Sequence, residues 1–422
     1  PYDILLINGT PNDVPLCQGI ITTDFQPPLS HINILSYNRG TPIMALKSAW
    51  DNEILNELDG KLVYYEVRTD SFSVEKAKTK NAEKFWNKNT PSKTITLQPD
   101  FSQIDLISIE DLDVKDADMV GAKAANFGEL DKIEGVVVPE AAFAIPFYWY
   151  KKHVEDNTID TLITDLLTDE IFTTNVDTLK KQLKSVRNAI KDAPINDTLL
   201  QIVSDKIREN ECYTRMRFRS STNAEDAKGF NGAGLYDSET GYLYNEDKSV
   251  EEAIKKVWAS LWNLRAFQER SYFKINNENV AMGILVHRSF PNEAVNGVVV
   301  TKNIYRPESS GHIVNLQKEE VSIVNPPFGI TSELFVLQQR NSTDPSTAYA
   351  DYISYSSANN NESLLSQEEL IVLNETLLAI KTHFYRKWKA QWKMNLTEFG
   401  VDIELKYDGE NRQLYIKQAR PY

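Results

Sequence analysis

A polar segment at residues 77–106 divides the chain into two parts of unequal length. The segment is rich in Lys and Asn and shows little hydrophobic periodicity, whereas apolar residues recur at regular spacing on both sides of it. A segment without apolar periodicity builds no core of its own, so we predict a linker here. If flexible, about 30 residues span roughly 30 Å root-mean-square and roughly 100 Å when fully extended. The chain is therefore expected to fold as separate domains.

The two flanking parts carry different patterns. Residues 1–76 alternate short apolar runs, such as DILLI and KLVYYEV, with turn-rich connectors, which is typical of a small unit of strands and helices. Residues 107–422 mix helical and strand patterns over a length too great for one simple core, so we expect two lobes. The chain has 422 residues, of which 41% are hydrophobic, enough to bury several cores. We predict a chain of mixed helices and strands, of the broad α/β class, arranged as an α+β multidomain protein.

Local signals place several elements in the long part. Ser249 with Glu252, and Ser366 with Glu369, have the spacing of a helix capping box, and each precedes apolar residues at helical spacing. The Trp and Leu residues of these helices are expected in the core. The C-terminal stretch VDIELKYDGENRQLYIKQARPY predicts two strands around a turn at residues 408–409.

Composition excludes several function classes. The formal net charge is -14, which disfavours general nucleic-acid binding, because phosphate neutralisation needs clustered Lys and Arg. No window approaches the roughly 18 apolar residues of a membrane span, and the first residues lack the basic region of a signal peptide. Cys17 and Cys212 lack CxxC spacing, so a reducing cytoplasm fits best. Because the chain begins with Pro1, we expect further sequence upstream.

His31 is the first candidate for chemistry. It opens an apolar element in the stretch PPLSHINILSYN, directly after Ser30. A helix that begins there would offer free backbone N–H groups and a positive dipole end, which suit a phosphate. On the residues alone, an ordinary loop histidine beside an N-cap serine explains the pattern better. The other histidines lack acidic or cysteine partners at ligand spacing or lie inside a predicted helix, so we expect no zinc site at His153, His287, His312 or His383.

A second candidate is the stretch MVGAKAANFGEL at residues 119–130. Glycines flank Lys123 ahead of an Ala-rich helix. This arrangement suits a loop whose backbone approaches phosphate oxygens while the lysine supplies a positive charge. The stretch lacks the spacing of a Walker A motif, so by itself it is a weak signal.

A third candidate is the block RMRFRSSTNAEDAKGFNGAGLYDS at residues 215–238. Arg215, Arg217 and Arg219 alternate, so a strand would place all three on one face. Such a face is unfavourable unless an anion neutralises it. The hydroxyl and glycine residues that follow supply further donors, as polyphosphate binding requires. A solvated basic edge strand is the alternative.

The fourth candidate lies in the two C-terminal strands. Asp402 and Glu404 share one strand face, and Gln418 and Arg420 share a face of the partner strand. Oxygen ligands beside an arginine suit Mg²⁺ and nucleotide phosphates. An exposed hairpin with alternating charges would give the same pattern, so both interpretations stay open.

Together, these segments resemble the phosphoenolpyruvate synthase and pyruvate phosphate dikinase family. The stretch TDFQPPLSHINILSYNRGTP is similar to its phosphohistidine swivelling domain. The stretches VGAKAANFGEL, RFRSSTNAEDAKGFNGAGLYDS, VWASLWNLRAFQERSY and LYIKQARPY are similar to its nucleotide-binding domain of ATP-grasp type. The resemblance implies a swivelling domain at 1–76, N-terminally truncated, a linker at 77–106 and a two-lobed ATP-grasp domain at 107–422.

The resemblance also implies site residues and cofactors. His31 would be the transient phosphoryl carrier, phosphorylated by ATP and then moved to an acceptor. Lys123 and Arg219 would contact ATP phosphates, and Arg420 would bind a phosphoryl oxygen. Mg²⁺ would be held by Glu404 and Gln418. The activity implied is a dikinase-type phosphotransfer that uses ATP and Mg²⁺.

The order of the domains bears on the acceptor. The histidine unit precedes the nucleotide-binding domain, and no pyruvate-binding barrel follows, an order that resembles the glucan, water dikinases. Pyruvate, a glucan or an unidentified molecule is therefore the expected acceptor. An ATP-binding regulatory module without turnover is the alternative, although a degenerate site would have lost some of the residues named above. The oligomeric state is not readable from the sequence.

Overall fold

The structure of the chain is a computed structural model. It describes residues 2–9, 14–25, 30–68, 70–89, 91, 93–168, 175–210, 212–225, 230, 232, 234–306, 308–323, 327 and 329–422. The side chains at positions 31, 34, 38 and 392 lie outside this description. Two predicted motifs are affected, because residues 26–29 before His31 and part of the segment 226–233 also lie outside the described residues.

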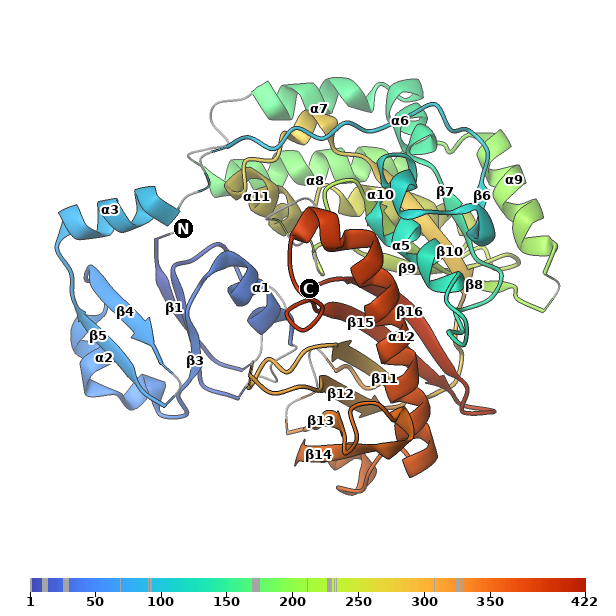
Figure 1. Cartoon of the computed structure of the whole chain (residues 1–422). Coiled ribbons are helices and arrows are strands. Elements are labelled where there is room, and N and C mark those ends of the chain that lie inside the picture. The colour runs from blue at the N-terminus through green and yellow to red at the C-terminus, as the bar shows by residue number, and fades with distance from the viewer. Residues whose placement is uncertain are drawn as a thin grey trace.

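The first part of the chain holds two small sheets (Figure 1). A parallel sheet has the order β1-β2-β3, and α1 connects β2 with β3; β4 and β5 pair antiparallel beside α2. A small core of Val14, Cys17, Ile20 and Ile32 joins α1 to the parallel sheet. The elements are β1 (Ile4–Ile7), β2 (Gly19–Thr22), α1 (His31–Arg39), β3 (Ile43–Ala45), a 3-10 turn (Ala49–Asp51), α2 (Glu53–Leu58), β4 (Val63–Val67) and β5 (Phe72–Lys76).

Helix α1 begins at the predicted position. Ser30 is its N-cap, and the Ser30 hydroxyl accepts a hydrogen bond from the backbone N–H of Asn33. Gly40 ends the helix in the left-handed conformation, at a φ of 64°, which a residue with a Cβ adopts less readily. His31 is therefore the first residue of a helix, where unpaired backbone N–H groups gather.

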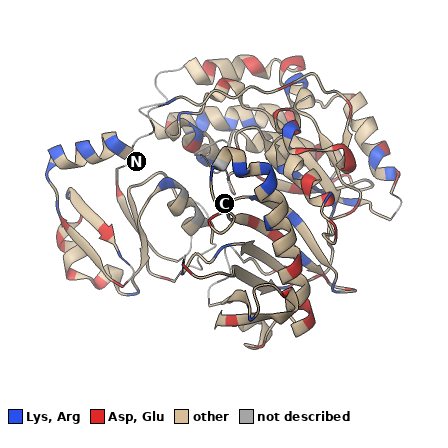
Figure 2. Cartoon of the chain, viewed as in Figure 1, with Lys and Arg blue, Asp and Glu red and all other residues tan. Residues whose placement is uncertain are grey.

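The predicted linker is not without structure. Helix α3 (Thr79–Asn89) lies within it, buries none of its residues and carries a stripe of lysines (Figure 2). Lys, Glu and Ala are good helix formers, so this segment can form a helix without burying an apolar face. A prediction based on apolar periodicity therefore missed the helix. Further along, Ile95 pairs with Ile275, and the indole N–H of Trp149 donates to the carbonyl of Ile104. The limits 77–106 stay a prediction as a domain boundary.

The next part of the chain is a five-stranded sheet with helices above one face (Figure 1). The strand order is β6-β7-β10-β8-β9, and all neighbours are antiparallel. Its elements are β6 (Ile107–Ser108), two 3-10 turns (Ile109–Asp111 and Val114–Asp116), α4 (Ala117–Val120), α5 (Ala122–Asp131), β7 (Phe143–Ile145), α6 (Phe147–Asp156), α7 (Ile159–Thr168), α8 (Val176–Asp192), α9 (Asp197–Arg208), β8 (Arg215–Thr222), β9 (Ser238–Tyr242), α10 (Val250–Ser260), α11 (Leu264–Tyr272), a 3-10 turn (Asn277–Asn279) and β10 (Met282–Arg288).

The last part is a six-stranded sheet with one long helix. The order is β14-β13-β12-β11-β15-β16, again antiparallel throughout. The predicted C-terminal strand pair is confirmed as β15 and β16. The elements are β11 (Glu293–Val300), β12 (His312–Lys318), β13 (Glu333–Gln339), a 3-10 turn (Pro345–Thr347), β14 (Ala348–Ser354), a 3-10 turn (Ser357–Asn359), α12 (Gln367–Trp392), β15 (Val401–Asp408) and β16 (Leu414–Pro421).

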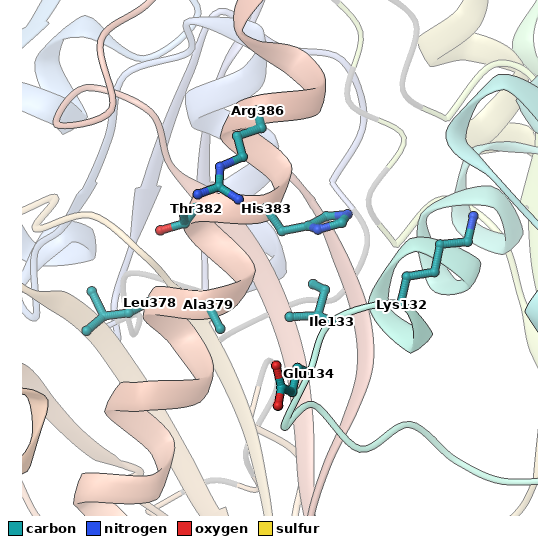
Figure 3. Close-up of a pocket in the computed structure, with 8 residues that line it drawn as sticks. All are labelled: Lys132, Ile133, Glu134, Leu378, Ala379, Thr382, His383 and Arg386. Atoms are coloured by element: carbon teal, nitrogen blue, oxygen red, sulfur yellow. The ribbon is translucent and has the colours of Figure 1, made fainter.

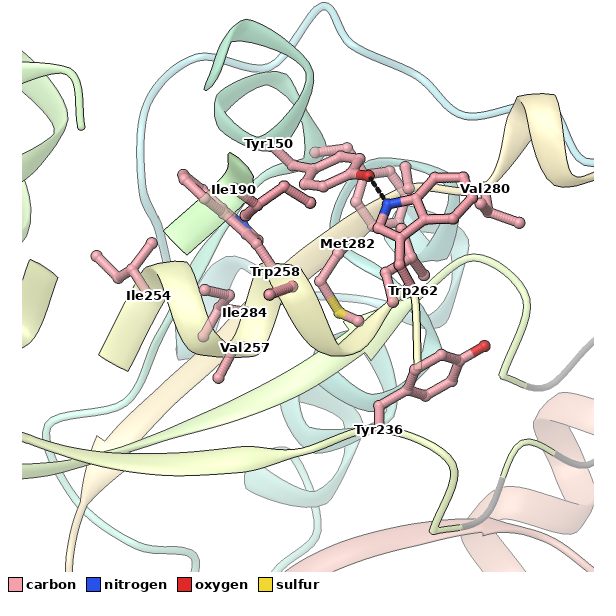
Figure 4. Close-up of a cluster of buried hydrophobic side chains, with 14 of the residues drawn as sticks. Tyr150, Ile190, Tyr236, Ile254, Val257, Trp258, Trp262, Val280, Met282 and Ile284 are labelled. Carbon is pink, nitrogen blue, oxygen red and sulfur yellow. Dashed lines mark hydrogen bonds between the residues drawn. The ribbon is translucent and has the colours of Figure 1, made fainter. Parts of the chain in front are cut away.

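Two large cores hold these sheets together. The first joins the helices α6 to α11 to one face of the five-stranded sheet, and it contains Trp258 and Trp262, as predicted for the Trp residues of the helix after Ser249 (Figure 4). There the indole N–H of Trp262 donates to the Tyr150 hydroxyl at 2.9 Å, so that burial leaves neither group unpaired. The second core packs α5 and α12 against the six-stranded sheet. Helix α5 therefore lies between the two sheets.

Both helices begin at the predicted serine, but the predicted capping box is complete only at Ser366. The Ser249 hydroxyl accepts the backbone N–H of Glu252 at the start of α10, and Ser366 and Glu369 form a complete capping box at the start of α12. The whole architecture confirms the α+β multidomain class. Among the described residues, no helix is both long and apolar enough to cross a membrane.

Candidate nucleotide-binding site

Three elements bring the predicted phosphate-binding residues together. Arg219 lies on β8 of the five-stranded sheet, Lys123 lies in the first turn of α5, and Glu404 and Gln418 lie on β15 and β16 of the six-stranded sheet. Strand β16 forms one edge of its sheet. The site is thus a junction between two sheets, with the start of α5 beside it.

Lys123 is held close to β8. Its Nζ lies 2.8 Å from the carbonyl oxygen of Ser220 and 3.0 Å from a carboxylate oxygen of Glu225. The Ser221 hydroxyl accepts the backbone N–H of Ala124 at 2.9 Å. Burial lowers the pKa of Lys123, the attraction of Glu225 opposes that shift, and the charge of Arg219 adds to it. Lys123 therefore lies in the first turn of a helix, rather than in the loop that the glycines suggested.

Gly121 allows this close approach. Its φ is +87°, and an added Cβ would lie 2.3 Å from the carbonyl carbon and oxygen of Ser221. Both the left-handed backbone and the contact exclude a side chain at this position. The glycine before Lys123 is thus required for packing between α5 and β8, which fixes where the lysine lies.

Arg219 joins the two sheets. One guanidinium nitrogen, Nη2, lies 2.6 Å from Glu404 Oε2 and 2.9 Å from Gln418 Oε1. The other, Nη1, donates to the carbonyl oxygen of Lys417 at 2.8 Å. The side chain of Arg219 is 7% exposed, whereas that of Glu404 is 36% exposed. One buried cation is therefore shared by the buried Gln418 and by Glu404, whose carboxylate is partly accessible from outside.

A second ion pair follows along the same strands. Arg420 donates to Asp402 Oδ2 from Nε at 3.0 Å and from Nη2 at 2.6 Å. The register pairs Asp402 with Arg420 and Glu404 with Gln418. The predicted sharing of strand faces is confirmed, and all four side chains lie on the face opposite the core that contains Ile403 and Leu405.

The charges around Glu404 shift several pKa values. Burial alone would raise the pKa of Glu404, but the positive charges of Arg219, Lys417, Lys123 and Arg420 hold it well below its usual range. Burial, and then the charge of Arg219, lowers the pKa of Lys417 to about 7 against the attraction of Glu404. Burial and the neighbouring cations thus both disfavour the charged form of Lys417, and a bound anion would relieve that effect.

The structure decides two interpretations that the sequence left open. Strand β8 lies between β10 and β9, so the alternative of a solvated edge strand for the arginine stripe is wrong. Strand β15 lies between β11 and β16, and Gln418 and Arg420 are each 6% exposed, so the alternative of an exposed hairpin is also wrong. The basic and acidic side chains of this region are buried against each other, and burial of charges requires such pairing.

Sequence reasoning missed two residues of the cluster. Glu225 pairs with Lys123 although more than a hundred positions separate them. Lys417 Nζ lies 3.9 Å from Glu404 Oε2, and the register of β15 and β16 shifts between Glu404 and Leu405. This irregularity changes the alternation of β16, so a simple period of two could not assign Lys417 to the site.

A cavity of about 400 Å³ lies at the other end of α5 and is separate from this cluster (Figure 3). Side chains of α12 line one side of it, and residues 132–134 line the other. The buried Glu129 carboxylate accepts a hydrogen bond from Lys387 and lies 2.6 Å from Nε2 of His383, which lines the cavity. His383 thus has an acidic partner that its position in the sequence did not reveal.

The family model that matches the chain is described as "Pyruvate phosphate dikinase, AMP/ATP-binding domain" and covers residues 117–422. The chain belongs to this family. The predicted resemblance is therefore confirmed, and ATP binding agrees with the family's description. The match contains Lys123, Arg219, Arg420, Glu404 and Gln418, whose roles stay predictions.

Three known proteins that are similar to this chain have different names. A phosphoenolpyruvate synthase of Helicobacter pylori is 25% identical, over 74% of this chain and 41% of that protein. A rifampicin phosphotransferase of Bacillus subtilis is 26% identical, over 43% of this chain and 21% of that protein. Alpha-glucan water dikinase 1, chloroplastic, of Arabidopsis thaliana is 26% identical, over 64% of this chain and 17% of that protein. The chain spans less than half the length of each of these relatives.

Proposed function

We propose that this chain is part of an ATP- and Mg²⁺-dependent phosphotransferase of the dikinase type, in which ATP phosphorylates His31. The phosphohistidine then passes its phosphoryl group to an acceptor. ATP is converted to AMP, and its other terminal phosphoryl group is transferred to water or to inorganic phosphate. The observation that carries the proposal is the position of Arg219. From the five-stranded sheet, its guanidinium contacts Glu404, Gln418 and the backbone of Lys417 in the six-stranded sheet.

Phosphoryl transfer depends on positioning and on neutralisation of charge, because the reacting oxygens carry most of the negative charge. Lys123, Arg219 and Arg420 supply positive charge from three separate elements, and we assign them to the phosphates of ATP. Their present partners, Glu225, Glu404 and Asp402, keep these cations paired with a carboxylate. Burial of the cations strengthens their attraction for an arriving polyphosphate.

The oxygen donors fit Mg²⁺. Glu404 stays ionised because of its lowered pKa, and the side-chain oxygen of Gln418 lies opposite it in the register. Mg²⁺ prefers such hard oxygens, and it takes only one or two protein ligands when phosphates and water complete its shell. When bound, the ion would neutralise charge on the transferred phosphoryl group.

A covalent intermediate on His31 gives the first unit a role in the reaction. Imidazole is a good nucleophile at neutral pH, and a covalent intermediate divides one difficult transfer into two easier ones. His31 lies at the start of α1, and the positive dipole end of a helix favours a phosphate there. This assignment of His31 rests on the sequence motif and on its place at the helix start, since its side chain lies outside the described residues.

The acceptor and the location in the cell are the finer parts of the proposal. The names of the relatives mention phosphoenolpyruvate, rifampicin and alpha-glucan. We infer pyruvate or a glucan as the acceptor, from the resemblance of the motifs and from the order of the two units. The two distant cysteines favour the cytoplasm.

Product analysis tests the reaction. We expect the chain with Mg-ATP to form AMP, with one of the two terminal phosphates on the protein, and we expect His31→Ala to form no AMP. Calorimetry tests the site: Arg219→Ala and Glu404→Ala should each weaken Mg-ATP binding at least roughly tenfold, because a charged hydrogen bond contributes about 1.5 to 3 kcal/mol.

Arg208→Ala is the matched control for Arg219→Ala. Arg208 lies on α9, and its ion pair with Asp205 is exposed, so Mg-ATP affinity should not change. Equal affinity for the wild type, Arg219→Ala and Glu404→Ala would contradict the assigned site. Binding of ATP without formation of AMP, in the wild type with each acceptor present, would favour a regulatory module instead.

A further inference from the structure

A buried ion pair joins the first unit to the rest of the chain. Arg39 is the last residue of α1, and Glu269 lies on α11. The Arg39 guanidinium forms an ion pair with the Glu269 carboxylate, and the side chains are only 3% and 4% exposed. Two charges buried in this way attract each other strongly, and either charge without its partner is unfavourable.

The first unit itself orients Arg39. Nη1 donates to the carbonyl oxygens of Val14 and Pro15, at 3.4 and 3.2 Å. These carbonyls lie just before β2, within the same unit as α1. The guanidinium is therefore fixed on the first unit, and Glu269 is the acidic group that it meets on the other side of the contact.

An aromatic contact also joins α1 to the C-terminal end of the described chain. The rings of Tyr37 and Tyr422 stack with centroids 5.8 Å apart and an angle of 14° between their planes. Leu35, also on α1, belongs to the same buried core as the helices α6 to α11. Helix α1 thus contacts the nucleotide-binding part through charged, aromatic and aliphatic side chains, with Leu35 and Arg39 on one face and Tyr37 on another.

The Tyr422 side of this contact lies close in the sequence to the nucleotide cluster. Tyr422 follows β16 two residues after Arg420, whose guanidinium pairs with Asp402. Positions 31, 35 and 39 of a helix share one face, so the start of α1 belongs to the face that Leu35 and Arg39 use for docking. By the rise of an α-helix, position 31 lies roughly 9 Å along the axis from Tyr37.

We propose that Arg39 and Glu269, supported by the stacked Tyr37 and Tyr422, position the first unit so that ATP phosphorylates His31. They are positioning residues, because they act through the placement of α1. The inference rests on the proposed function. It adds that the ion pair defines the docked arrangement and has to separate before the phosphohistidine reaches an acceptor elsewhere.

A double-mutant cycle tests this inference. The variants are Arg39→Met, Glu269→Met and the double variant, and the measurement is the single-turnover rate of label transfer from ATP to the protein. Each single variant leaves a charge buried without its partner, so we expect roughly tenfold slower transfer, with Arg39→Met the slower because it also loses the contacts to Val14 and Pro15. The double variant leaves no buried charge and should recover to within roughly threefold of the wild type.

Controls separate docking from folding and from nucleotide binding. ATP affinity by calorimetry should be unchanged in all variants, because none of these residues belongs to the nucleotide cluster. Arg208→Met, which disrupts the exposed pair with Asp205, should transfer label at the wild-type rate. Tyr37→Ala removes a side chain that is 71% exposed, so it should fold normally and slow the transfer by roughly threefold.

Small-angle X-ray scattering makes the outcome independent of the reaction. The single variants should have a larger radius of gyration than the wild type, and the double variant should return toward it. Single variants with the wild-type rate and radius would overturn the inference, as would a double variant as slow as the slower single one. If the wild type accepts no label from ATP, the proposed function fails, and scattering alone then decides whether the ion pair holds the units together.

Discussion

Binding of ATP is expected to transfer a proton onto Lys417. Burial, followed by the charges of Arg219, Arg217 and Lys123, lowers the pKa of this lysine to about 7, while Glu404 acts in the opposite direction. Polyphosphate next to its Nζ would stabilise the ammonium form and return the pKa toward its ordinary value. The bound complex therefore holds a proton that the free protein, above pH 7, has released.

The size of the effect follows from the lowered pKa. At pH 8, a lysine with a pKa of about 7 carries roughly 0.1 proton, so return of its pKa toward the ordinary value allows an uptake of up to roughly 0.9 proton per ATP. At pH 6 both forms are protonated, and the uptake by Lys417 falls to roughly 0.1. Burial also lowers the pKa of Lys406 to about 6, so a rise of that pKa on binding would add proton uptake above pH 6.

Calorimetry in buffers of different ionisation enthalpy measures this uptake. The slope of the observed binding enthalpy against the buffer enthalpy gives the number of protons taken up. We expect Lys417→Met to lose most of the uptake at pH 8, and Lys256→Met, which changes an exposed lysine on α10, to retain it. A slope that is independent of pH, or one that Lys417→Met leaves intact, would refute the reasoning.

Three stability predictions follow from other parts of the structure. Gly121→Ala should lower the free energy of unfolding by more than about 2 kcal/mol in denaturant titration, because its Cβ would overlap Ser221; an unchanged midpoint would show that α5 can move away. Burial raises the pKa of Glu333 from 4.5 to about 7, so the folded state binds the proton more tightly and stability falls as pH rises from about 4.5 through 7. Glu333→Gln should therefore stabilise the protein by up to about 3 kcal/mol at pH 8 and hardly at pH 4, and equal gains at both pH values would contradict this sign. Ser366→Ala should lower the unfolding free energy by about 1 kcal/mol, since it removes the acceptor for the Glu369 N–H, and no loss would contradict the cap.

Local patterns in the sequence predicted much of the candidate site. Alternation along a strand is a strict geometric rule, so Glu404 and Gln418 could be assigned to the faces on which the structure has them. Ser30 before a helix start and Ser366 with Glu369 are signals confined to a few residues, and both were confirmed. Such features depend on neighbours in the chain, which the sequence displays directly.

Features that depend on distant residues could not be predicted. Glu225 and Lys417 join the cluster through pairing between separate elements, and a shift of register moves Lys417 out of simple alternation. The helix Thr79–Asn89 forms without burying a residue, so apolar periodicity did not predict it. The pair of Arg39 with Glu269 links two units that are more than two hundred residues apart, and only their packing brings them together.

The site of phosphorylation tests the central claim most directly. The chain is incubated with Mg-ATP, digested at alkaline pH to preserve phosphohistidine, and mapped by mass spectrometry. We predict one acid-labile phosphoryl group on the peptide that contains Ser30 and His31, located on His31 and absent in His31→Ala. An unmodified peptide in the wild type, an acid-stable phosphoryl group on Ser30, or equal labelling of His31→Ala would contradict the account.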